Sequence, residues 1–150
     1  MDFGGGETWF VAGATLFLLA GGGHALLALL DTVRPRWFAP IDDSVRAPME
    51  GTGMRFRRPF PGDASKPSLW RFWLGFNVSH GLGAFAFGAV CILIAAHDYG
   101  LVARIGGLQA LTIAVSAGYF ATALRYWFNG VQVLTGTATT CFVLAAVLPA

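Results

Sequence analysis

The chain has 150 residues, of which 55% are hydrophobic and 12% are charged, and its formal net charge is +2. Soluble domains carry about 25% charged residues, so this composition excludes an ordinary water-soluble domain. The small net charge, without a clustered basic module, also excludes a nucleic-acid-binding protein. The length predicts one integral membrane domain covering residues 1–150.

Four apolar stretches are long enough to cross a bilayer, which takes about 20 residues in a helix. They cover residues 8–30, 69–96, 101–128 and 131–148. The segment 97–100 and the pair Asn129-Gly130 are short turn signals between the last three stretches. Helices joined by such tight turns are antiparallel neighbours. The sequence therefore predicts an all-α fold, an up-down bundle of four transmembrane helices.

Residues 31–68, between the first two apolar stretches, have a different composition. They hold six of the seven prolines and seven of the ten basic residues, which predicts a long Pro/Arg-rich loop. With Arg71 and Arg125, nine basic residues lie on one side of the membrane, and Arg104 lies alone on the other. The positive-inside rule then predicts a multi-pass protein of the cell (inner) membrane, with a cytoplasmic loop and both termini outside.

Some of these cations are expected to contact anionic lipid, because each Lys or Arg near such a surface contributes about 1 kcal/mol. The residues predicted to contact lipid headgroups are Arg55, Arg57, Arg58 and Arg125.

Polar residues inside the apolar stretches are costly and therefore mark a candidate site. His24 lies about 10 Å from the loop end of the first stretch, and His80 lies about 16 Å from the same end of the second, at 1.5 Å per residue. If the first two helices touch, the two imidazoles share one site. The candidate polar intramembrane site consists of His24, Asn77, Ser79, His80 and Tyr119.

Small residues near these histidines indicate close helix packing, because glycine lets two backbones approach within lipid. The residues predicted to pack helices in this way are Gly21, Gly22, Gly23, Gly75 and Gly83.

Four interpretations of the histidines stay open at this point. Imidazoles from two facing helices are typical axial ligands of haem b. A proton relay or a small-molecule site is a second interpretation, and a metal site is a third, although no further Cys, Asp or Glu lies at matching depth. The fourth is structural, with neutral histidines hydrogen-bonded between helices.

The string WLGFNVSHGLGAFAFG, from Trp73 to Gly88, resembles the signature of a family of small uncharacterised bacterial membrane proteins with a GFNxSHGLG motif in the second span. The resemblance also covers His24, the loop residues 49–54 and the Tyr126-Trp127-Phe128 string. It implies four spans and a characteristic polar cluster of Asn77, Ser79 and His80, but no reaction.

No nucleophile motif, phosphate-binding loop or pair of intramembrane carboxylates is present, so no catalytic residue or metal ligand is assigned and an enzyme is disfavoured. The function expected first is an accessory or structural subunit that packs against a larger membrane protein or in a homo-oligomer. The alternative is an intramembrane histidine site that uses His24 and His80 for haem b, proton relay or small-molecule binding.

Overall fold

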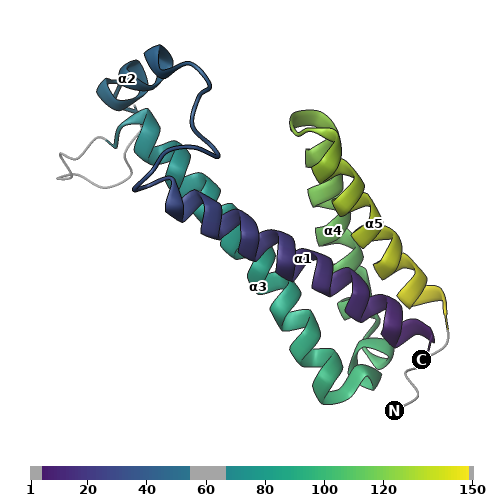
Figure 1. The fold of residues 1–150 in the computed structure, drawn as a ribbon. Helices are drawn as coiled ribbons and strands as arrows, with labels where there is room; N and C mark the ends of the chain where they lie inside the picture. Colours follow the sequence, from purple (N-terminus) through teal and green to yellow (C-terminus); the bar gives the residue numbers. More distant parts are fainter. Residues whose placement is uncertain (1–4, 55–66, 149–150) are drawn as a thin grey trace. The chain divides into compact units, whose positions relative to one another are not determined.

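The computed structural model describes residues 5–54 and 67–148, and within them the chain forms five helices and no strand. The helices are α1 (Gly5–Leu30), α2 (Asp43–Gly51), α3 (Leu69–Arg104), α4 (Gly106–Tyr126) and α5 (Asn129–Val147) (Figure 1). All except α2 are long and apolar enough to cross a membrane. The predicted all-helical fold is confirmed, and four such helices indicate a multi-pass membrane protein.

The expectation of one long loop over residues 31–68 is wrong, because this segment contains α2. Asp42 caps that helix, since its carboxylate accepts the N–H of Ser44 at 2.9 Å. Beyond α2, Leu69 donates its N–H to the carbonyl of Thr52 at 2.8 Å. The end of α2 is thus joined directly to the start of α3.

The two expected turns lie close to their predicted places but differ in detail. The chain leaves helical geometry at Asp98 (φ −162°, ψ 95°) and then makes a further helical turn before α3 ends. Arg104 pairs with the Asp98 carboxylate across this kink at 2.6 Å. At the next reversal the turn is formed by Trp127 and Phe128, and Asn129 already begins α5.

The chain divides into two compact units. The first unit consists of residues 1–21 and 83–150, and therefore contains most of α1, most of α3 and all of α4 and α5. The second unit consists of residues 22–82, with the end of α1, the whole of α2 and the start of α3.

The core of the first unit is built from small residues and aromatic rings. Phe142 of α5 packs against Phe10 of α1 at 5.3 Å between ring centroids, and against Phe87 of α3 at 5.8 Å. Phe17 of α1 meets Tyr119 of α4 edge-on at 5.2 Å. Edge-to-face rings at this separation contribute beyond the area they bury. Rings from all four long helices thus hold this unit together.

Backbones approach most closely between α1 and α3 at Gly88. A Cβ placed there would lie 2.5 Å from the carbonyl oxygen of Ala14 and from the nitrogen of Leu18. Only glycine fits such a contact, which is the way that helices pack tightly in lipid.

Candidate functional site

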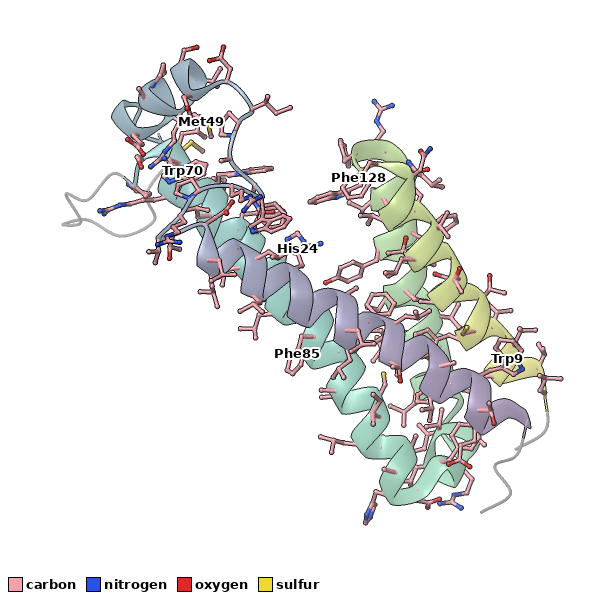
Figure 2. All side chains as sticks on the ribbon, viewed as in Figure 1. Trp9, His24, Met49, Trp70, Phe85 and Phe128 are labelled. Carbon is pink, nitrogen blue, oxygen red and sulfur yellow. The ribbon has the colours of Figure 1, made fainter. Side chains whose placement is uncertain are left out.

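The second unit brings together two histidines that are far apart in the sequence. His24, on the last part of α1, lies with its ring centroid 5.5 Å from that of His80 on α3, and the rings meet edge to face at 68°. Both side chains are partly buried. Figure 2 labels His24 where it projects from α1.

Asn77 lies one helical turn before His80 on α3 and is completely buried. Its amide nitrogen donates to the carbonyl of Trp73 at 2.8 Å, which fixes the orientation of the side chain. The amide lies beside the His24 ring, within hydrogen-bonding reach. Among the described residues, none donates to its Oδ1 with good geometry. A buried carbonyl without a donor is unfavourable by about 1–3 kcal/mol, so the site favours an N–H at this position.

Two aromatic rings enclose the pair. Phe76 stacks on His80 with an interplanar angle of 20° and 5.8 Å between centroids. Phe38, from the segment after α1, lies 4.6 Å from the His24 ring. The imidazoles therefore contact apolar ring faces as well as each other.

The position of Phe38 is fixed by hydrogen bonds to two side chains, those of the buried Asp31 and the exposed Trp73. The carboxylate of Asp31, at the end of α1, is fully buried and accepts three backbone N–H groups, from Arg36 at 2.9 Å, Trp37 at 3.0 Å and Phe38 at 2.6 Å. The indole N–H of Trp73 donates to the carbonyl of Phe38 at 2.9 Å. The bonds to the Asp31 carboxylate are charge-assisted, and such bonds are roughly twice as strong as neutral ones. They therefore order the segment that covers His24.

Ligation of haem b by both histidines would require their rings to move from this arrangement. The porphyrin plane would have to lie between two imidazoles that approach the iron from opposite faces. Here the two rings contact each other edge to face, and Phe76 occupies a face of His80. Within residues 5–54 and 67–148, no group of three or more His, Cys, Asp or Glu side chains could hold a metal ion.

The remaining two residues predicted for the polar site are Ser79 and Tyr119. Ser79 is exposed, and its hydroxyl donates to the carbonyl of Phe76 at 3.0 Å. Tyr119 belongs to the first unit, where it packs against Phe17.

Three of the glycines predicted to pack helices make no close contact with another helix backbone in the structure. A Cβ at Gly23 or Gly75 would meet nothing within 4 Å, and one at Gly83 would make an ordinary contact with the Tyr119 hydroxyl at 3.6 Å. Gly21 is buried and Gly22 is partly buried. Gly88, which is not among the predicted residues, makes the tight approach described above.

Of the four arginines predicted to contact lipid, Arg125 is exposed in the last turn of α4. Arg55, Arg57 and Arg58 lie outside the described residues, so the prediction for them stays a prediction.

Sequence reasoning missed three residues that build this site: Asp31, Phe38 and Trp73. An Asp directly after an apolar helix, followed by a short segment with a proline, is a signal for a carboxylate that binds nearby backbone N–H groups. Nothing in the local sequence indicates that Phe38 covers His24, because that contact depends on tertiary structure.

Comparison of the chain with protein-family models, curated proteins and solved structures finds no match. The class that fold and composition define is therefore an all-helical, multi-pass membrane protein, and its role has to be argued from the histidine site.

Proposed function

We propose that this membrane protein binds a proton on the His24–His80 pair. The observation that carries the proposal is the contact of the two imidazoles, with centroids 5.5 Å apart, within the span-length helices α1 and α3. Histidine is the side chain whose unperturbed charge change falls between pH 5 and 8. Ionisable groups within spans are typical of proton pathways and ligand sites.

The pair is suited to hold one proton rather than two. Two unit charges 5.5 Å apart repel by up to about 3 kcal/mol at an effective dielectric constant of about 20. A first proton on either ring therefore opposes a second, and the pair titrates as one coupled system. The buried carbonyl of Asn77 offers an acceptor to an N–H of His24. Phe38, from the segment after α1, lies beside the His24 ring and shields it.

Histidine ring NMR of the full chain in lipid nanodiscs tests the proposal. The three histidines are His24, His80 and His97, and His97 is exposed and serves as an internal control. We expect the pair to take up its protons in two separate steps. In His24→Gln, His80 should titrate in a single step at a changed midpoint. Independent single-step titration of both histidines, unaffected by loss of the other, would contradict proton sharing.

A second candidate function is that of an accessory or structural subunit in a larger membrane assembly or a homo-oligomer. It is favoured by the large apolar side chains on the outer faces of the spans, such as Leu82 and Leu93, which suit either lipid or a protein neighbour. The proposal includes the inner membrane, a cytoplasmic α2 and outer termini, on the charge bias described above. It also includes membership of the family of small four-span bacterial membrane proteins that the GFNxSHGLG string resembles.

Two measurements test this candidate. Labelling of a cysteine at position 46 from the cytoplasmic side alone is expected, and labelling only from outside would contradict the orientation. Affinity purification from native membrane in mild detergent is expected to recover a stoichiometric partner. Recovery of a lone, stable monomer would contradict the subunit role.

A further inference from the structure

A groove runs along α3 in the second unit, on residues that the histidine site does not use. It has a volume of about 640 Å³ and is walled by α2, by the start of α3 and by Thr32 after α1. A smaller pocket of about 400 Å³ shares its polar end and adds Ser68. Figure 2 labels Trp70 and Met49 in the region where α2 meets α3.

The polar end of the groove carries two arginines and one acid. The Nε–H of Arg46 donates to the Glu50 carboxylate at 2.8 Å. The Arg46 guanidinium also lies over the buried ring of Trp70, 5.4 Å from its centroid. This holds the Arg46 guanidinium in place before any ligand arrives. Arg71 also lines the groove and forms no ion pair with any described residue. The balance of two cations and one acid favours an anion.

Beyond the arginines the groove follows α3 and is mostly apolar, with Thr32 and Ser79 as its polar lining residues. Leu74, Val78 and Leu82 line it beyond the arginines, and the helix rise from Trp70 to Leu82 is about 18 Å. Gly75 opens the wall, since a Cβ there would meet nothing within 4 Å. The groove thus has a charged end and an apolar length along a span. It matches a lipid whose headgroup lies at the membrane surface.

We propose that this groove binds one anionic phospholipid, with its phosphate between Arg46 and Arg71 and an acyl chain along Leu74, Val78 and Leu82. An acidic peptide would leave the apolar length of the groove empty. A zwitterionic lipid carries its own cation beside the phosphate and so gains less from the arginines. The proposal is independent of the protonation of the histidines.

Native mass spectrometry of the full chain in detergent tests the proposal, with phosphatidylglycerol and phosphatidylcholine of identical acyl chains as probes. We expect one tightly bound phosphatidylglycerol and a preference of about fivefold or more, the ratio that corresponds to about 1 kcal/mol for one basic side chain. Glycerol 3-phosphate, which has no acyl chain, should not displace the lipid. Displacement by it, or equal binding of both lipids, would overturn the site.

Matched variants locate the site. Arg71→Gln should reduce the preference for phosphatidylglycerol about fivefold, whereas Arg104→Gln, at an exposed arginine in the last turn of α3, should leave it unchanged. Gly75→Leu fills the groove and should weaken binding of both lipids. Its control is Gly118→Leu, because that glycine also faces open space. Equal losses in Arg71→Gln and Arg104→Gln, or in the two glycine variants, would show nonspecific adsorption instead.

Discussion

The carboxylate of Asp31 accepts the backbone N–H of Phe38 at 2.6 Å, and the ring of Phe38 in turn lies 4.6 Å from that of His24. A buried acid at the end of α1 thereby positions the ring that covers a histidine two helical turns earlier. The two groups belong to one structural unit, so the segment after α1 is part of the histidine site.

Replacing Asp31 by Ala should destabilise the protein and release this segment. Three backbone N–H groups would lose a buried acceptor, and leaving such groups unsatisfied costs about 1–3 kcal/mol. Unfolding by denaturant in micelles should show a loss of about 2 kcal/mol. Asp43→Ala, at an exposed acid of α2, is the control; a loss of the same size there would contradict the assigned role.

Trp73→Phe should uncover His24 while keeping an aromatic ring at the start of α3. The change removes the indole N–H that donates to the Phe38 carbonyl. We expect His24 to react several-fold faster with diethylpyrocarbonate, measured by peptide mass spectrometry, with His97 as an unchanged internal standard. Trp37→Phe, at an exposed ring, should leave the rate as it is. An unaltered rate in Trp73→Phe would show that Phe38 does not protect the histidine.

Gly88→Ala should loosen the packing of α1 on α3. The added methyl would lie 2.5 Å from backbone atoms of Ala14 and Leu18, so the backbones of α1 and α3 would have to move apart. Overpacking of this kind costs about 1–3 kcal/mol, which thermal unfolding in micelles would detect. Gly118→Ala adds the same methyl in open space and should be neutral or stabilising, because Ala is the better helix former. Equal stability of the two variants would refute the close contact.

The stability of α2 should depend on pH through its cap. The N–H of Ser44 bonds to Asp42 and lowers the pKa of that carboxyl from its ordinary 3.8. Because the folded pKa is the lower one, the cap stabilises α2 fully above the ordinary value and is lost as the pH falls through the lowered value. Protection of the Ser44 amide against exchange, relative to its intrinsic rate at each pH, should therefore fall in acid. Asp42→Asn should abolish that dependence, and its persistence in the variant would exclude the cap as the cause.

The sequence predicts the four long helices well, because a bilayer requires about 20 apolar residues and the hydropathy of this chain meets that requirement four times. It predicts α2 poorly. A helix of nine residues that contains Pro48 resembles a loop locally. Its cap at Asp42, the Arg46–Glu50 ion pair and its junction with α3 hold it. The turn near Asn129-Gly130 was displaced by two residues, because both residues are also compatible with a helix start.

Helix rise alone predicts that His24 and His80 lie at similar depth. It does not predict which faces meet, because that depends on the packing of α1 and α3 in three dimensions. The covering segment depends on contacts between residues up to 35 positions apart, such as that of Trp73 with Phe38. No local pattern encodes such contacts.

The contact of His24 with His80 is the basis of the proposed function, and cysteine cross-linking in membranes tests it most directly. His24→Cys/His80→Cys, with Cys91 and Cys141 replaced by Ser, would be treated with a short bis-thiosulfonate reagent. Cyanogen bromide then cuts at Met49 and Met54, between the two positions. We predict that the two fragments of this variant stay joined until reduction. The control variant is His24→Cys/Ser79→Cys, which uses the exposed neighbour of His80, and its fragments should separate without reduction. Separation of the fragments in the first pair, or equal joining in both, would contradict a shared histidine site.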